Sequence, residues 1–263
     1  MSEFKVIDFH THPYIEEKER IGMYIDEFAM STEDFFSDAK EANVFKACGS
    51  VIGKNVKGFD DIQRFNRHAL KLRDMYCDVY VPGFHVHPEY VEKSIAEIEF
   101  GIVNGVRLIG ELVPYSHKWG NNGYSSAGFM EILDFINGKN MIVNLHIGSP
   151  EELIELEKPI SFYKNITFVL AHPGYGERFE KHLEINKKYE NTYLELSGSG
   201  IEVFGAIRKI VNNVGYERLL FGTDYPVTAF KTYISAVLSE KISEEAKEHI
   251  LFENARELLG VLE

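Results

Sequence analysis

Two histidines near the start of the sequence have the spacing to bind one metal ion. His10 and His12 follow a mostly apolar stretch, residues 6–9, that predicts a β-strand. Side chains two residues apart on a strand point to the same side, so both imidazoles can face one point at the strand's end. Pro13 has no N–H to give to a neighbouring strand and should end this one. A His-x-His pair alone is weak evidence, and its weight depends on the other ligands that the chain can supply.

Four further residues of ligand type end other apolar stretches. They are Glu111, His146, His172 and Asp224. Neutral imidazole and carboxylate together suit Zn²⁺, with Mn²⁺ or Fe²⁺ as substitutes. An ion held in this way keeps an open position for water and lowers the pKa of that water towards neutrality. Asp224 could then orient the water and accept its proton, as a general base must.

These residues need a fold that brings strand ends together, and the sequence predicts one. Eight apolar, β-branched or aromatic runs alternate with helical patterns. The runs are residues 4–10, 45–52, 79–85, 105–111, 141–146, 166–172, 192–197 and 218–223. Near-continuous runs of this kind suit strands that are covered on both faces, as in a parallel sheet.

Helical spacing between the runs supports the alternation. In segment 60–77 the apolar residues fall at steps of three and four, which predicts an amphipathic helix. The first helix is expected around residues 33–42. Ser149 has the context of a helix N-cap, and Ser243 should begin the last helix, which is expected to stop at Gly260.

Eight strands alternating with helices in 263 residues predict a (β/α)8 TIM barrel, distorted, as a single domain over residues 1–263. A doubly wound open sheet is the alternative, but the sequence lacks the glycine fingerprint that usually follows an early strand of such a sheet. In (β/α)8 barrels the chemistry takes place at the C-terminal ends of the strands. The six candidate ligands should therefore converge on one rim.

Charge and apolar content narrow the class of partner. The chain has 41 acidic and 28 basic residues and a net charge of −13, which opposes nucleic-acid binding and favours a small-molecule substrate. No apolar run approaches the roughly 20 residues that a bilayer span needs. No basic and then apolar leader precedes the first strand. We therefore expect a cytoplasmic protein without a membrane partner.

Taken together, the motifs resemble those of the amidohydrolase superfamily. The likeness rests on His10-Thr11-His12, His146, His172, Gly222-Thr223-Asp224-Tyr225-Pro226 and the final stretch 250–260. The branch it resembles most is amidohydrolase 2, which includes carboxymuconate-semialdehyde-type decarboxylases. The resemblance implies that His10, His12, His146 and Asp224 bind one metal ion. It also implies that His172 polarises the substrate or acts on the water held by the metal.

One motif departs from that branch. Gly110-Glu111-Leu112 resembles the TatD-type metal-dependent hydrolases, in which the glutamate bridges two metal ions. That resemblance implies one ion on His10, His12 and Asp224, and a second on His146 and His172, with Glu111 between them. The alternative is that Glu111 only holds a ligand imidazole in place. We expect one or two divalent ions, zinc first and manganese or iron as substitutes.

The main functional expectation is hydrolysis of a small-molecule amide, ester or lactone through metal-activated water. Non-oxidative decarboxylation of a small aromatic or unsaturated acid is the alternative that the amidohydrolase 2 resemblance implies. A TatD-like phosphodiesterase or nuclease is the alternative that Glu111 implies. Because related barrels often dimerise, the resemblance also admits a homodimer.

Three residues outside the ligand set are candidates for substrate binding. Lys54 follows the second predicted strand, His87 follows the third and Arg178 follows the sixth. Lysine and arginine can anchor a carboxylate or phosphate, and arginine can do so with two parallel hydrogen bonds. The alternatives are solvated cations for the two basic residues and a partly exposed turn for His87.

An aromatic loop follows the fourth predicted strand. It contains Tyr115, His117, Trp119 and Tyr124. At a barrel mouth such a loop predicts a lid or a wall of the ligand site, or else a contact with a neighbouring subunit.

Overall fold

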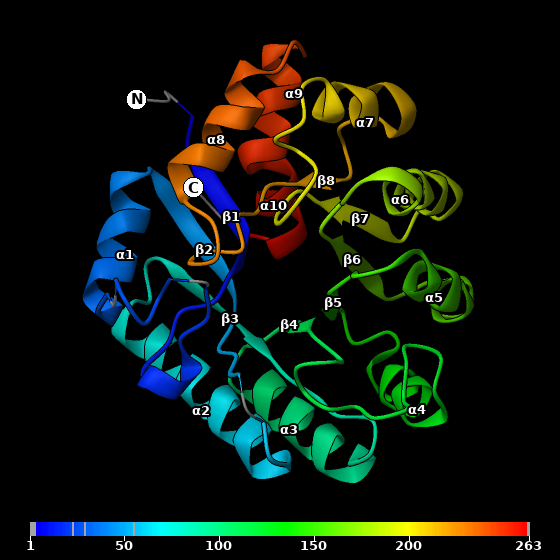
Figure 1. Ribbon diagram of the computed structural model, residues 1–263. Helices are drawn as coiled ribbons and strands as arrows, with labels where there is room; N and C mark the ends of the chain where they lie inside the picture. The colour runs from blue at the N-terminus through cyan, green and yellow to red at the C-terminus, as the bar shows by residue number, and fades with distance from the viewer. Residues whose placement is uncertain (1–3, 23, 29, 55, 262–263) are drawn as a thin grey trace.

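Eight parallel strands, each paired with the next along the chain, form the centre of the molecule (Figure 1). The computed structural model describes residues 4–22, 24–28, 30–54 and 56–261. The strands are β1 (Val6–Thr11), β2 (Val44–Ser50), β3 (Tyr80–Phe84), β4 (Leu108–Leu112), β5 (Ile142–Leu145), β6 (Thr167–Ala171), β7 (Thr192–Glu195) and β8 (Leu219–Leu220). The predicted (β/α)8 TIM barrel is confirmed, as a single domain.

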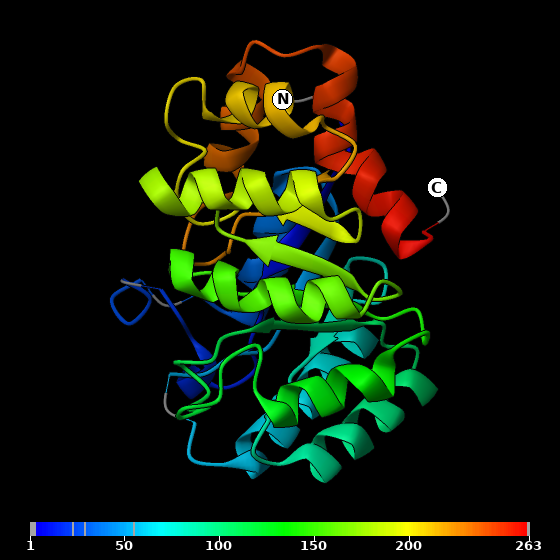
Figure 2. The same ribbon diagram turned by 90° about the vertical axis from the view of Figure 1, so that its right-hand side faces the viewer.

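Helices follow the strands and surround them (Figure 1). They are α1 (Thr32–Glu41), α2 (Phe59–Met75), α3 (Val91–Val103), α4 (Ala127–Ile136), α5 (Pro150–Phe162), α6 (Gly176–Lys188), α7 (Ala206–Val214), α8 (Phe230–Ser239), α9 (Glu244–Glu248) and α10 (Asn254–Leu259). Figure 2 shows α5, α6 and α7 side by side on the outside of the sheet. In the described part of the chain, no helix has both the length and the apolar character needed to cross a membrane.

The predicted helices begin and end close to their expected positions. The helices expected at 33–42 and 60–77 are α1 and α2. Ser149 caps α5, because its side chain accepts a hydrogen bond from the Glu152 N–H while the Glu152 carboxylate accepts one from the Ser149 N–H. These local signals place α5 so that the loop before it, which carries His146, stays at the rim.

The first and last strands close the barrel through only a few backbone hydrogen bonds. Phe9 N donates to Phe221 O, and Asp224 N donates to His10 O, both at 2.8 Å. The run 218–223 was predicted as a full strand, but β8 covers only Leu219–Leu220. The reason is the buried Asp8 carboxylate, whose Oδ1 accepts from the N–H of Thr223 at 3.1 Å and replaces a strand-to-strand bond.

The last helix also differs from the prediction. Between α9 and α10 the chain forms a π-helical turn, His249–Glu253, before it stops at Gly260 in the left-handed conformation. A π turn leaves a carbonyl without its usual helical partner. Here Ile250 O accepts a hydrogen bond from Phe221 N at 3.0 Å, so the turn ties the C-terminal helix to the residue that follows β8.

Candidate metal centre

The six residues predicted as ligands lie together at one rim of the barrel. They are His10 (in β1), His12 (just after β1), Glu111 (in β4), His146 (just after β5), His172 (just after β6) and Asp224 (shortly after β8). The rim encloses a cavity of about 490 Å³, here called the metal cavity. Five of the six line it, and His10 lies fully buried beside them.

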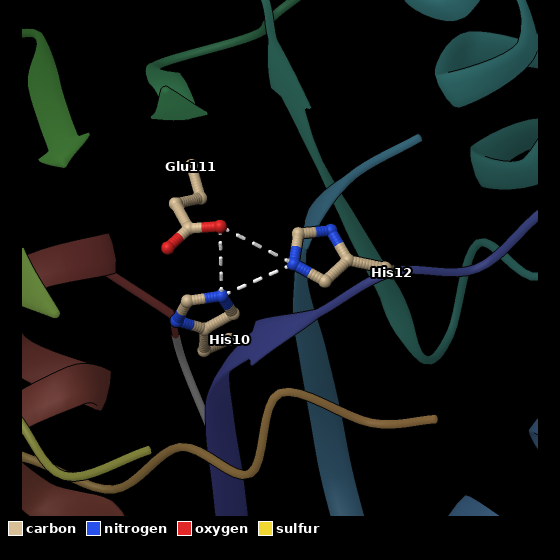
Figure 3. A group of neighbouring side chains, drawn as sticks. All are labelled: His10, His12 and Glu111. Carbon is tan, nitrogen blue, oxygen red and sulfur yellow. Dashed lines mark hydrogen bonds and ion pairs between the residues drawn. The ribbon is translucent and has the colours of Figure 1, made fainter. Parts of the chain in front are cut away.

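His10, His12 and Glu111 form a compact group (Figure 3). The two Nε2 atoms are 3.1 Å apart, and Oε2 of Glu111 lies 3.3 Å from His10 Nε2 and 3.5 Å from His12 Nε2. Asp224 Oδ1 lies 3.3 Å from His12 Nε2 and 3.7 Å from His10 Nε2. Four atoms at tetrahedral corners, each about 2.0–2.1 Å from a zinc ion, would lie about 3.3 Å from one another. The donor set therefore fits a divalent ion of that size.

The other oxygen of Glu111 faces a second pair of histidines. Oε1 lies 2.8 Å from His172 Nε2 and 3.0 Å from His146 Nδ1. The carboxylate thus stands between two groups, with His10 and His12 at one oxygen and His146 and His172 at the other. The structure brings together every residue that the sequence predicted as a ligand.

A carboxylate that the sequence analysis did not single out holds His10 in position. Glu195, in β7, is fully buried, and its Oε2 lies 2.8 Å from His10 Nδ1. Because a carboxylate only accepts, Nδ1 donates and Nε2 is left free for a metal. His12 Nδ1 donates likewise to the backbone carbonyl of Ser50 at 3.0 Å. Gly222 makes room for this arrangement, since a Cβ there would lie 1.7 Å from Glu195 Oε1.

Ser197 links the two halves of the site and was also missed. Its Oγ lies 2.7 Å from Glu195 Oε2. It also lies 3.0 Å from the Nδ1 atoms of His10 and His172. A single acidic residue inside the buried run 192–197, followed two positions later by a hydroxyl on the same side, was the signal that could have revealed both.

Two residues of the site have left-handed backbone conformations. The φ angles of His172 and Asp224 are +64° and +63°. Such conformations cost a non-glycine residue about 1 kcal/mol or more and concentrate at functional sites. The turns after β6 and β8 therefore hold these two side chains at the rim in a backbone conformation that residues other than glycine usually avoid.

Neighbouring charges set the protonation of the site. Burial lowers the pKa of His12, but hydrogen bonds with Asp224 and Glu111 outweigh it and raise that pKa to about 9. Burial also lowers the pKa of His10, whereas the Glu111 and Glu195 carboxylates raise it well above its usual value. Burial raises the pKa of Glu111, but the surrounding imidazoles hold it well below its usual range. The carboxylates draw positive charge into the site, and a divalent ion supplies that charge without protons.

Of the three residues predicted to bind substrate, Lys54 lines the metal cavity. Its Nζ lies 3.5 Å from Asp26 Oδ2, with both side chains largely exposed. Exposed pairs of this kind contribute little. Lys54 therefore remains available to an anionic ligand.

His87 does not line the metal cavity, and substrate binding by this residue stays a prediction. Its Nε2 donates to the carbonyl of His117 at 3.1 Å, and its Nδ1 accepts from the N–H of Glu89 at 3.2 Å. Nε2 thus ties the loop after β3 to the loop after β4, while Nδ1 bonds within the loop after β3. The His-x-His spacing of His85 and His87 could not show that these rings bond to backbone.

Arg178 is also absent from the lining of the metal cavity, and substrate binding by this residue stays a prediction. Its Nη1 donates to the carbonyls of Ile147 and Gly148, and its Nη2 donates to Ser199 Oγ. The guanidinium therefore braces the loops after β5 and β7 through Nη1 and Nη2.

The aromatic loop after β4 contributes one wall of the cavity. Tyr115 lines the metal cavity, and its ring centre lies 5.2 Å from that of His146. Trp119 and Tyr124 are buried instead, and Tyr124 Oη donates to the carbonyl of His146 at 2.6 Å. The loop is thus anchored by two aromatic residues and presents a third to a ligand.

Comparison with known structures finds the same fold over nearly the whole chain. A 2,6-dihydroxybenzoate decarboxylase complexed with 2,6-dihydroxybenzoate matches with a TM-score of 0.79 and 13% identity, over 98% of this chain and 100% of that chain. A probable 2-pyrone-4,6-dicarboxylic acid hydrolase from Acinetobacter baumannii, with citric acid bound, matches with a TM-score of 0.69 and 18% identity, over 98% and 100%.

A third solved structure contains a metal. It is 5-carboxyvanillate decarboxylase from Novosphingobium aromaticivorans, complexed with manganese and 4-hydroxy-3-methoxy-5-nitrobenzoic acid. It matches with a TM-score of 0.71 and 14% identity, over 98% of this chain and 97% of that chain. Identities this low show a shared fold and do not transfer an activity.

Sequence comparison gives the family. No curated protein sequence matches the chain. The amidohydrolase family profile, however, matches residues 7–261, from β1 past the end of α10. The match includes all six residues of the candidate metal centre. The chain therefore belongs to the amidohydrolase family.

Proposed function

We propose that this chain is a metal-dependent hydrolase acting on a small-molecule amide, ester or lactone. The observation that carries the proposal is the position of Asp224. Its Oδ1 lies 3.3 Å from His12 Nε2 among the candidate ligands, while its side chain also lines the metal cavity. A carboxylate so placed can contact both a metal ion and a water molecule in the cavity, as a general base in metal-assisted hydrolysis must.

The chain's own residues divide the remaining work. A divalent ion, proposed to be zinc with manganese as the alternative, would polarise the scissile carbonyl and lower the pKa of a nearby water. Asp224 would accept a proton from that water as the water oxygen bonds to the carbonyl carbon. It would return the proton to the leaving nitrogen or oxygen as the bond from the carbonyl carbon to that atom breaks. Burial lowers the pKa of His172, but the Glu111 carboxylate raises it above its usual value. His172 lines the metal cavity beside Glu111 and is proposed to polarise the substrate or to act on the water.

Glu111 is proposed as a metal ligand. With one ion, its Oε2 would join His10, His12 and Asp224, and His172 would stay free for catalysis. With two ions, its carboxylate would bridge them and His172 would become a ligand. The approach of each oxygen to a different pair of histidines supports a direct role over a purely supporting one.

Non-oxidative decarboxylation is the second candidate, because two of the three matched structures above are decarboxylases. In that reaction the bond to the carboxylate breaks, carbon dioxide leaves and the ring carbon takes up a proton. Asp224 lines the cavity and would be the donor of that proton. The same residue thus serves either reaction, and the substrate decides between them.

A substrate screen tests the proposal. Protein purified without chelator or histidine tag is assayed for acid released from lactones, esters and amides, and for carbon dioxide released from aromatic acids. We expect hydrolysis of at least one class, lost in Asp224→Asn. Carbon dioxide without hydrolysis would replace the first function by the second. Unchanged turnover by Asp224→Asn would overturn both.

A further inference from the structure

A second hollow lies beside the metal cavity, and basic residues dominate its lining. It has a volume of about 730 Å³ and is here called the basic chamber. Its charged residues are Lys18, Arg20, Lys54, Lys57, Arg64 and Lys118, together with Glu17, Asp26 and Asp61. Six cationic side chains and three anionic ones line it, in a chain with a net charge of −13, and Lys18 also pairs with Glu16, outside the lining, at 2.7 Å. The lining of this hollow is therefore basic, whereas the chain as a whole is acidic.

The basic chamber and the metal cavity are neighbours. Lys54 and Lys118 line both of them. A small molecule with one group at the candidate ligands can therefore extend past these two lysines into the chamber. The lysines mark the passage between the two hollows.

Each acidic residue of the chamber contacts a basic residue of the chamber other than Lys57 and Lys118. Asp61 contacts Arg64, and Glu17 Oε1 lies 3.7 Å from Arg20 Nη1. Asp26 makes the exposed contact with Lys54 described above. Within the described parts of the chain, the Nζ atoms of Lys57 and Lys118 have no acidic partner.

The loop holds Lys118 in place. Its φ angle is +56°, and the residues on either side of it, His117 and Trp119, are fully buried. Their backbone N–H groups bond to the carbonyls of Val113 and Pro114 at 3.0 and 3.1 Å. Two buried neighbours with fixed backbone leave the side chain of Lys118 no direction but outward. A left-handed residue kept at such a point indicates a functional constraint.

We propose that the basic chamber binds a second anionic group of the substrate, a carboxylate or phosphate, while the reacting group lies in the metal cavity. The inference rests on the proposed function and extends it to the substrate class, a small molecule with an anionic group remote from the bond that reacts. Lys118 and Lys57 supply charge that pairs with no carboxylate among the described residues. Lys54 stands between the two groups of the ligand.

Calorimetry on metal-free protein at low ionic strength, where screening is weakest, tests the chamber separately from catalysis. The probes are inorganic phosphate and tricarballylate, a tricarboxylate. We expect at least one of them to bind. Lys118→Asn should weaken that binding about threefold to tenfold, since asparagine tolerates the left-handed backbone but carries no charge. Lys57→Gln provides a second reading if Lys118→Asn folds poorly.

The matched control is Lys187→Gln. Lys187 is exposed near the end of α6, lines neither hollow, and loses the same charge. Its probe affinity should equal that of the unmodified protein. Equal affinity in Lys118→Asn and Lys57→Gln, or no binding of either probe, would overturn the proposal. If only phosphate binds, the substrate is assigned as a phosphorylated molecule. If only tricarballylate binds, it is assigned as a polycarboxylate.

Failure of this inference can be told apart from failure of the proposed function. If the probes bind in the chamber but no hydrolysis or decarboxylation is found, anion binding by the chamber is supported and the proposed function is rejected. If a neutral lactone is hydrolysed and Lys118→Asn leaves probe binding unchanged, the function stands and the chamber falls.

Discussion

Glu195 Oε2 and His10 Nδ1 lie 2.8 Å apart, and both side chains have no exposed surface. The contact joins β7 to β1 and fixes which nitrogen of His10 carries the proton. Nε2 then faces Glu111, His12 and Asp224 in the form that binds metal. The geometry of the centre thus depends on a residue that does not line the metal cavity.

Glu195→Gln should weaken metal binding by about 10- to 100-fold, because glutamine keeps the size of the side chain but loses the charge that favours the Nδ1–H form. Competition with a chromophoric chelator would measure this affinity. Glu190→Gln, at an exposed position before β7, is the control and should leave it unchanged. Equal affinities for Glu195→Gln and the unmodified protein would show that the contact does not prepare His10 for metal.

Asp224→Asn should lower turnover about 100- to 10,000-fold while the protein stays folded, since asparagine cannot accept the proton of water. Turnover and bound metal need to be measured on the same sample. A loss of turnover with metal retained assigns proton transfer to Asp224. A loss of both identifies it first as a ligand.

Removing the metal should destabilise the protein. A ligand present at about 1,000 times its dissociation constant stabilises the folded state by about 4 kcal/mol, which corresponds to a fall in Tm of roughly 10 °C on removal for a chain of this size. Dialysis against chelator followed by thermal unfolding measures it, and added zinc or manganese should restore the Tm. An unchanged Tm after dialysis against chelator would contradict a metal centre.

Metal content per chain then assigns His172 and Glu111. Elemental analysis giving about one ion would leave His172 for catalysis. About two ions would make Glu111 the bridge and His172 a ligand. In either case Glu111→Ala should lower the metal content, and an unchanged content would remove Glu111 from the ligand set.

Acid should destabilise the fold through its buried neutral histidines. Burial lowers the pKa of His182 to about 3, helped by Arg178, and burial lowers the pKa of His85 to about 4. In the unfolded chain histidine titrates near 6.5. As the pH falls below about 6.5, these histidines therefore take up protons in the unfolded state but not in the folded state. The stability that is present above that pH is lost progressively until the pH reaches the folded-state pKa values of about 4 and 3.

The expected size is roughly 2 kcal/mol for each such histidine between pH 7.5 and pH 5. Urea unfolding of the unmodified protein and His182→Gln at both pH values isolates one of them. Between pH 7.5 and pH 5, the free energy of unfolding of His182→Gln should fall by about 2 kcal/mol less than that of the unmodified protein. His249→Gln, at a partly buried position, serves as the comparison. Parallel losses in all three proteins would show that His182 does not contribute.

The sequence could predict the six candidate ligands because each stands at the end of an apolar run, and a parallel barrel gathers such ends. The sequence shows Glu195 as a single acidic residue in an apolar run, but inward and outward positions of a strand buried on both faces look alike, so the sequence could not show that its carboxylate reaches His10. It also could not show that His87 and Arg178 lie outside the lining of the metal cavity, because both sit in loops after strands, and only the folded backbone shows where their polar atoms bond. The shortening of β8 depends on the Asp8 carboxylate reaching Thr223, a contact between residues far apart in the chain.

The closure of the barrel between β1 and β8 has a consequence for how the protein matures. His10 and His12 are made first, but Asp224 reaches them only when the segment after β8 pairs with β1, and the π turn beyond it receives the N–H of Phe221. During synthesis the chain must have emerged past Asp224 and the π turn after it before these ligands can meet. The set of candidate ligands is therefore completed late, and a product stalled before Asp224 would keep the histidines but not the complete set.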